Sequence, residues 1–167
     1  MRVALIAAAL VALAGCGFKP MYAPTAAGAA PLIGPVTVPE VRGKAGHAFR
    51  TELTRLLEAE SGDGAPKQLE IAVTETVTPL GLRVDESSTR ADFIMTATYK
   101  LLDPNGAELV RGTSAATVSY DIPVAAYGAA AAQDDARERA GVLLADRVRT
   151  DLALRLSRLR NAAPATP

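Results

Sequence analysis

Residues 91–101 (ADFIMTATYKL) decide the fold, because apolar and polar side chains alternate along them. Alternation with a period of two indicates a β-strand that has one buried and one exposed face. The sequence Asp-Pro-Asn-Gly follows at 103–106, and its proline and glycine favour a tight turn. Residues 110–120 then alternate again, with Val110, Val118 and Tyr120 on the apolar side. This stretch predicts a long antiparallel hairpin with one apolar face.

The length of the turn predicts the register of this hairpin. A four-residue turn at 103–106 places Tyr99 opposite Val110 and Phe93 opposite Ala116. Most apolar residues then have an apolar or small neighbour across the hairpin. A shift by one residue would move every apolar side chain of one strand to the wrong face, so we expect this pairing.

Further elements flank the hairpin. Phe49 and Leu53 recur at helical spacing and predict a helix from about residue 46 to residue 60. Residues 68–77 alternate, with Leu69 and Val77 on the apolar side, and predict a strand that is followed by a loop at 78–89. A short strand is expected at 35–41 and a long helix from about 129 to 160. The order β-α-β-β-β-α predicts an α+β fold, with two helices packed on one face of a four-stranded mixed sheet.

The amino-terminal end has the pattern of a lipoprotein signal. Arg2 is followed by an apolar run from 3 to 14, which is too short to span a bilayer and is typical of a secretory leader. Cys16 is the only cysteine, and it stands where a bacterial lipoprotein carries its lipid. We therefore expect a signal peptide at 1–15 and a diacylglycerol on Cys16, with fatty chains such as palmitate. The alternative is ordinary cleavage after Ala14, which would leave Cys16 as a free thiol.

The residues after the cysteine predict where the protein is held. Gly17 occupies the position where aspartate favours retention in the inner membrane, so we expect a lipid anchor at the periplasmic face of the outer membrane. Residues 16–34 contain three prolines and no periodicity, and they predict an extended, lipidated tether. A single α+β domain is expected at 35–160, followed by a disordered tail at 161–167.

Charge and composition exclude several functions. The chain has 18 basic and 18 acidic residues, and loss of Arg2 with the leader makes the remainder slightly negative, which gives no attraction to nucleic acid. His47 is the only histidine, and no triad, phosphate-binding loop or clustered metal-ligand pattern occurs. The sequence therefore predicts a protein that is not an enzyme and has no metal site and no cofactor.

Charged residues in the last predicted helix have a structural interpretation. Asp134 and Asp135 near its start, and Arg155, Arg158 and Arg160 near its end, would complement the helix dipole. A ligand-binding role for these arginines is the alternative interpretation.

Two helices can cover only one face of the predicted sheet, and the other face stays open. By alternation, the open face carries many hydroxyl side chains and few long charged ones. Its hydroxyl residues are Thr74, Thr76, Thr96, Thr98, Thr113, Thr117 and Ser119. The residues alone favour a solvated antiparallel face. A second interpretation is a surface that lies against another polar wall, such as the lumen of an outer-membrane barrel.

Several short motifs carry a resemblance over nearly the whole chain after the leader. They are CGFKPMY at 16–22, ATYKLLD at 97–103, SYD at 119–121 and DARERA at 135–140. Together with the lipoprotein signal and the order of elements, they resemble the LptE family of lipopolysaccharide-assembly lipoproteins, in a short and divergent form.

The resemblance implies partners rather than a reaction. Proteins of this family plug the lumen of the outer-membrane barrel LptD and help to deliver lipopolysaccharide, so the hydroxyl residues of the open face become candidate barrel contacts. The family also binds lipopolysaccharide, whose phosphates favour basic side chains. Candidate lipopolysaccharide-binding residues are Arg83, Arg90, Lys100 and Arg111.

Two other classes of function remain open at this point. One is an auxiliary outer-membrane lipoprotein of an ABC-type lipid-transport system, which has a similar small α/β build. The other is a periplasmic binding or inhibitor module that has no role in transport. The identity of the protein that copurifies with the chain would distinguish these classes from lipopolysaccharide assembly.

Overall fold

A computed structural model describes residues 34–82 and 88–162, and these ranges contain four strands and two helices. In chain order the elements are β1 (Val36–Thr37), α2 (Lys44–Ala59), β2 (Lys67–Leu82), β3 (Ser88–Leu102), β4 (Glu108–Asp121) and α3 (Ala126–Ala162). This order is the predicted one. The signal peptide at 1–15, Cys16, the tether up to residue 33 and the tail from residue 163 lie outside the described residues, so the domain boundaries remain predictions.

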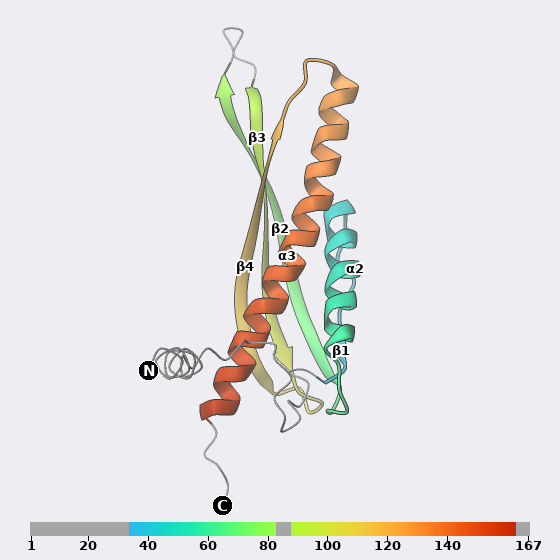
Figure 1. Cartoon of the computed structure of the whole chain (residues 1–167), viewed down its shortest axis with the longest axis vertical. Helices are drawn as coiled ribbons and strands as arrows, with labels where there is room; N and C mark the ends of the chain where they lie inside the picture. Colours follow the sequence, from blue (N-terminus) through green and yellow to red (C-terminus); the bar gives the residue numbers. More distant parts are fainter. Residues whose placement is uncertain (1–33, 83–87, 163–167) are drawn as a thin grey trace, which may run out of the picture. The chain divides into compact units, whose positions relative to one another are not determined.

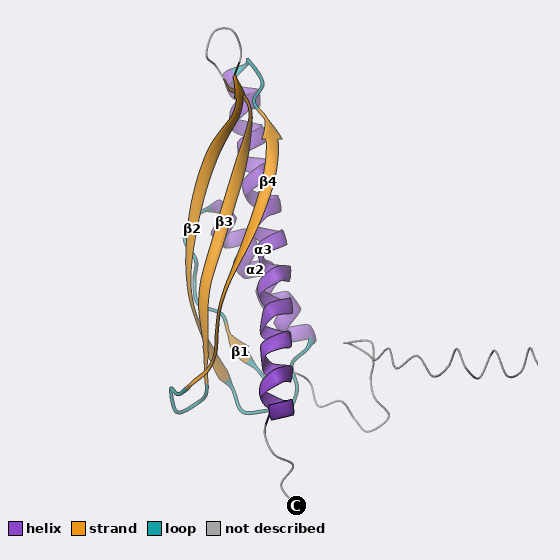
Figure 2. Ribbon diagram, turned by 90° about the vertical axis from the view of Figure 1, so that its left-hand side faces the viewer, coloured by secondary structure: helices purple, strands orange, loops and turns teal. Residues whose placement is uncertain are grey.

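The four strands form one mixed sheet in the order β1-β2-β3-β4. Short β1 runs parallel to β2, whereas β2–β3 and β3–β4 are antiparallel. Figure 1 shows α3 running beside the long strands with α2 next to it, and Figure 2 shows both helices on the same side of the sheet. The predicted α+β fold, with two helices on one face of a four-stranded mixed sheet, is confirmed.

Alternation along β3 supplies the centre of the hydrophobic core. Phe93, Met95 and Tyr99 are at most 1% exposed, and all of them face the helices. The helices contribute their own apolar stripes to this core: Phe49, Leu53 and Leu57 from α2, and Leu144, Val148 and Leu152 from α3. Burial of apolar area on this one side of the sheet is the main source of stability, at roughly 25 cal/mol per Å².

The two helices approach each other closely where Gly141 of α3 meets the first turns of α2. A Cβ atom on Gly141 would lie 2.5 Å from the carbonyl oxygen of Ala45 and 2.9 Å from the backbone nitrogen of Phe49. Both neighbours are backbone atoms, so a side chain at this position would push the helices apart. At the other end of α2, Arg149 of α3 donates a hydrogen bond to Glu60. The close contact at Gly141 and the Arg149–Glu60 ion pair at the other end of α2 therefore join the two helices.

The predicted register of the hairpin is wrong by two residues. Tyr99 pairs with Gly112 instead of Val110, and Phe93 pairs with Val118 instead of Ala116. The predicted faces are nevertheless correct, because a shift by two residues keeps every side chain on the same side of the sheet.

Two separate insertions produce this shift. The turn contains five residues rather than four, since the backbone amide of Asp103 donates to Ala107 and the Asp103 carboxylate accepts from the amides of Asn105 and Ala107. The pairing also skips one residue beside the turn, where Leu102 pairs with Glu108 and the next pair along the ladder is Leu101 and Val110. The turn and this bulge each add one residue.

Strand β2 is longer than predicted, and the expected loop at 78–89 is wrong for most of its length. Thr78, Pro79 and Leu80 all have cross-strand partners in β3. Proline is normally a signal against a strand, but an edge strand tolerates it where its nitrogen points away from the neighbouring strand. The strand also extends beyond its cover. The 16 residues of α2 span about 24 Å, whereas the 16 residues of β2 span about 53 Å. Val77 is therefore 39% exposed, although it lies on the predicted apolar side.

The last helix is longer at both ends than predicted. It begins at Ala126 and continues to Ala162, so Asn161 and Ala162 belong to the helix and not to the tail. The early start places Asp134 and Asp135 beyond the first turn, which contains no acidic residue. The helix-dipole interpretation of these two acids is therefore wrong, and their partners are basic side chains.

The helix crossing generates a stability prediction. Gly141→Ala should lower the free energy of unfolding by about 1–3 kcal/mol, because the new methyl group meets backbone of α2. Gly128→Ala is the matched control in the same helix, since its Cβ would meet only the side chain of Pro123, at 3.3 Å. Urea unfolding of both purified variants measures the difference. Equal stabilities would contradict the close helix crossing.

Candidate docking face and its charged ends

The open face of the sheet consists of the side chains that point away from both helices. All seven hydroxyl residues expected on this face lie there, as their cross-strand pairing and exposure show: Thr74, Thr76, Thr96, Thr98, Thr113, Thr117 and Ser119. Six of them are exposed, and only Thr96 is half-buried. The sequence therefore predicts the side of the sheet on which these seven residues lie correctly, although Ile94 and several long charged side chains share that face. Whether the face contacts a barrel remains a prediction.

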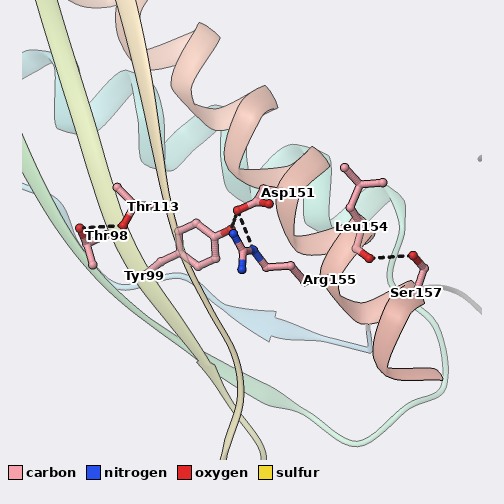
Figure 3. Close-up of polar contacts among 7 residues, drawn as sticks. All are labelled: Thr98, Tyr99, Thr113, Asp151, Leu154, Arg155 and Ser157. Carbon is pink, nitrogen blue, oxygen red and sulfur yellow. Dashed lines mark hydrogen bonds and ion pairs between the residues drawn. The ribbon is translucent and has the colours of Figure 1, made fainter. Parts of the chain in front are cut away.

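Hydroxyl groups on neighbouring strands interact across this face. The Oγ1 atoms of Thr98 and Thr113 lie 3.5 Å apart, and Figure 3 shows them on the side of the sheet opposite α3. Ser119 donates a 2.6 Å hydrogen bond to the carboxylate of Asp92 on β3. Short side chains of this kind keep the face flat. Each hydroxyl can still donate or accept a further bond.

A pair of basic residues lies at one end of the open face, beside the turn. Lys100 and Arg111 are cross-strand partners, and Glu70 is the partner of Lys100 on its other side. Glu108 accepts two hydrogen bonds from the Arg111 guanidinium, at 2.8 Å from Nε and 2.6 Å from Nη2. These bonds lower the pKa of Glu108 and raise the pKa of Arg111. This end therefore holds two basic side chains, each with an acidic residue beside it, and the Arg111 guanidinium is held in place by Glu108.

The other candidate cations do not join this pair. Arg90 lies on the same face but ten residues along β3 from Lys100, which corresponds to about 33 Å. Its guanidinium lies 3.5 Å from the carboxylate of Asp121. Arg83 lies outside the described residues. The structure therefore brings together two of the four candidates, Lys100 and Arg111.

A groove of about 790 Å³ runs between α2 and α3 on the side of the helices away from the sheet. Lys44 bridges it with a 2.6 Å ion pair to Asp134, which also accepts a 3.0 Å bond from Arg137. The hydrogen bond from Lys44, followed by that from Arg137, lowers the pKa of Asp134. Exposed His47 also lines the groove. Sequence reasoning missed this groove, because helical periodicity does not show which residues of two different helices face each other.

The Lys44–Asp134 ion pair joins the two helices across the groove, and because both side chains are exposed its contribution to stability is small. Within residues 34–82 and 88–162, no group of histidine, cysteine and carboxylate side chains is arranged to hold a metal ion. None of the helices in these ranges combines the length and hydropathy needed to cross a bilayer.

One of the arginines near the end of α3 belongs to a polar network between β3 and α3. Tyr99 donates a hydrogen bond to Asp151, which also accepts one from Arg155 at 2.9 Å, as Figure 3 shows. Burial raises the pKa of Tyr99, and the bond to Asp151 adds to this effect. Gly112 lies opposite Tyr99, and a side chain there would collide with the phenol. Arg155 therefore pairs with a carboxylate one turn away inside α3, and not with the helix end as the helix-dipole interpretation predicts.

The comparison with known proteins identifies the family. The LptE family, described as lipopolysaccharide-assembly, matches residues 33–156. The chain belongs to the LptE family. This match covers every strand and all but the last residues of α3. LptE-family proteins are lipopolysaccharide-assembly lipoproteins, and no enzymatic activity is part of that description.

Solved structures of lipoproteins resemble this LptE-family chain. A crystal structure from Caulobacter crescentus CB15, assigned as a lipoprotein, is 31% identical with a TM-score of 0.58, over 73% of this chain and 90% of that one. Rare lipoprotein B from Shewanella oneidensis is 14% identical with a TM-score of 0.58, over 75% and 97% of the two chains. Lipoprotein B from Nitrosomonas europaea is 16% identical with a TM-score of 0.53, over 87% and 94%. The similarity to the Shewanella oneidensis and Nitrosomonas europaea lipoproteins shows a shared fold. No curated protein matches the sequence.

The ion pair at the charged end generates a pH prediction. A lowered pKa means that the Glu108–Arg111 pair is intact at neutral pH and is lost as the pH falls through that lowered value. Arg111→Gln should raise the pKa of Glu108 toward the usual value for glutamate, because the largest cause of the lowering is removed. Arg90→Gln is the control, since Arg90 lies at the far end of the face. Carboxyl ¹³C NMR titration measures the shift, and an unchanged Glu108 titration in Arg111→Gln would contradict this pairing.

Proposed function

We propose that this LptE-family lipoprotein is anchored through Cys16 at the periplasmic face of the outer membrane. There it plugs and supports the lipopolysaccharide-translocating barrel LptD and assists lipopolysaccharide assembly. The observation that carries this proposal is the open face of the sheet, which is hydroxyl-rich and has no helix over it. Membership in the LptE family supports the link to lipopolysaccharide.

The chemistry of the open face suits the inner wall of a barrel. The lumen of an outer-membrane barrel is lined by polar side chains and water. Threonine and serine hydroxyls can donate to or accept from such groups in either direction. Their short side chains lose little conformational entropy on docking, whereas long lysine or arginine chains would lose up to about 2 kcal/mol each. A surface of short hydroxyl side chains can therefore lie against a polar wall at a low cost in conformational entropy.

The position of the domain's first described residues is compatible with a lipid anchor. Gly34 lies against Gly64 and Ala65, beside the start of β2. The proposed tether at 16–34 would reach at most about 68 Å if fully extended. A tether of this length would allow the domain to enter a barrel that lies beside its own lipid anchor.

The basic pair at the charged end is the proposed lipopolysaccharide contact. Lys100 and Arg111 are neighbours on adjacent strands, so that one phosphate group can bind both side chains. An incoming phosphate would compete with Glu108 for the guanidinium of Arg111. Arg90, which already has Asp121 beside it, lies too far away to share that phosphate.

The docking proposal predicts the effect of a bulky charge at the centre of the open face. Thr98→Arg should reduce the recovery of LptD with this lipoprotein from detergent-solubilised outer membranes by about tenfold or more, because the new cation must be buried against the barrel. Thr51→Arg makes the same change at an exposed position of α2 and should leave recovery unchanged. Immunoblotting of the purified material measures both.

Two results of this experiment would contradict the docking proposal. One is equal recovery of LptD with both variants. The other is that the unmodified protein copurifies with a periplasm-spanning lipid-transport protein and with no barrel, which would instead support the auxiliary role in ABC-type transport.

The proposed lipid contact is tested separately. The double change Lys100→Gln and Arg111→Gln should weaken lipopolysaccharide binding at least tenfold, since each charge-assisted hydrogen bond contributes about 1.5–3 kcal/mol. Arg90→Gln should leave binding nearly unchanged, because its charge lies several Debye lengths from the basic pair and is screened. Surface plasmon resonance on immobilised lipopolysaccharide measures both variants. Unchanged binding by the double variant would exclude this pair as the contact.

A further inference from the structure

The last turns of α3 carry arginines that the fold uses only in part. Arginines occur at positions 155, 158 and 160, and no acidic residue follows Asp151 in the sequence. The side chain of Arg155 pairs with Asp151 at 2.9 Å. Arg158 is exposed, and no residue in the described ranges forms an ion pair or hydrogen bond with its side chain. This end of the helix therefore has a net positive charge that packing does not explain.

Two leucines are exposed beside these arginines. Leu154 is 38% exposed and Leu159 is 49% exposed, whereas Leu152 is fully buried. Leu154 lies four residues before Arg158, and Leu159 lies four residues after Arg155. Residues at this spacing are neighbours on a helix surface, so each leucine lies next to an arginine. The outward side of these turns is therefore both basic and apolar.

These turns lie at the end of the domain where the chain from the amino terminus enters it. Gly34 lies against Gly64, just before β2 begins, and β1 pairs with the start of β2. Asp151 accepts a hydrogen bond from Tyr99, which lies three residues before the end of β3, and this end of β3 pairs with the start of β2. Figure 1 shows the end of α3 and the short β1 at the same end of the long sheet. The basic end of α3 and the proposed tether therefore share one end of the domain.

A phospholipid surface has the chemistry that this combination requires. Guanidinium groups form charge-assisted hydrogen bonds with phosphates, and anionic headgroups attract basic residues. Leucines of a helix that lies in the interface enter the boundary between headgroups and acyl chains. A polar barrel wall would satisfy the arginines and leave the leucines without an apolar partner. We propose that residues 154–159 of α3 bind the anionic phospholipid surface of the membrane to which the protein is anchored.

A weak contact is sufficient because the anchor holds the domain near the membrane. One basic residue near an anionic surface strengthens binding only about fivefold. The proposed tether at 16–34 is at most about 68 Å long, so the contact forms within one anchored molecule at a high effective concentration. The contact then sets the orientation of the domain, with the β1 end toward the membrane. This inference rests on the proposed lipid anchor and not on docking to a barrel.

A fluorescent probe on the last turn of α3 tests the contact. The full-length lipoprotein carries Asn161→Cys labelled with nitrobenzoxadiazole, whose emission rises in an apolar environment. It is reconstituted in vesicles of phosphatidylcholine, either alone or with an equal part of phosphatidylglycerol. Emission should be about twofold higher with phosphatidylglycerol, and about 1 M NaCl should remove the difference by screening the charges. Ala130→Cys, an exposed position near the other end of α3, is the control and should give equal emission in both vesicles.

Charge reversal tests the role of the arginine that has no partner. Arg158→Glu should abolish the rise in emission at position 161, because the new carboxylate is repelled by anionic headgroups. Arg50→Glu makes the same change at an exposed position of α2 and should retain the rise. Leu154→Ser together with Leu159→Ser should reduce the rise by about half or more, since the apolar contribution is lost.

Several results would overturn the proposal. They are equal emission at position 161 in the two kinds of vesicle, an equal rise at positions 130 and 161, and an unchanged rise in Arg158→Glu. A rise with vesicles that contain lipopolysaccharide, and none with phosphatidylglycerol, would assign the arginines to that glycolipid and would also overturn it. Failure of the anchor is a separate result, because Cys16 without its lipid would be labelled and the protein would not float with phosphatidylcholine vesicles.

Discussion

The structure depends on one packing constraint, which is that both helices cover the same face of a narrow sheet. Phe93, Met95 and Tyr99 of β3 are buried because α2 and α3 lie side by side over them. That arrangement requires the helices to come close together, and Gly141 permits the contact with Ala45. Both helices bury their apolar stripes on this face, so no helix remains to cover the opposite face of the sheet. The sheet must therefore be stable with one side exposed, and threonine meets this requirement because it favours strands and tolerates water.

The functional surfaces follow from this one-sided design. The open face has hydroxyl groups at its centre and the basic pair Lys100 and Arg111 at one end. The side with the helices carries ion pairs, such as Lys44 with Asp134, that hold the helix pair together. The surfaces proposed to bind the barrel and lipopolysaccharide thus lie on the sheet, and the helices provide stability.

The sequence predicts those features that depend on alternation or on helical spacing. The alternating pattern of β3 and β4 predicts the fold class and the side of the sheet on which the hydroxyl residues of the open face lie. The register was wrong because the Asp103 turn and the neighbouring bulge depend on local hydrogen bonds that alternation does not report. The sequence does not predict the extension of β2 past Pro79. A strand tolerates proline at the edge of a sheet, and alternation does not show which strand lies there. Likewise, contacts between distant residues, such as Lys44 with Asp134, depend on the helix crossing.

The central claim is that the open face is covered in the assembled membrane and exposed in the isolated protein. Cysteine at position 98 reports this directly, with cysteine at position 51 of α2 as the reference. A hydrophilic maleimide should label both positions in the purified lipoprotein. In native outer membranes it should label position 51 and leave position 98 largely unmodified. Equal labelling of the two positions in native membranes would contradict the account.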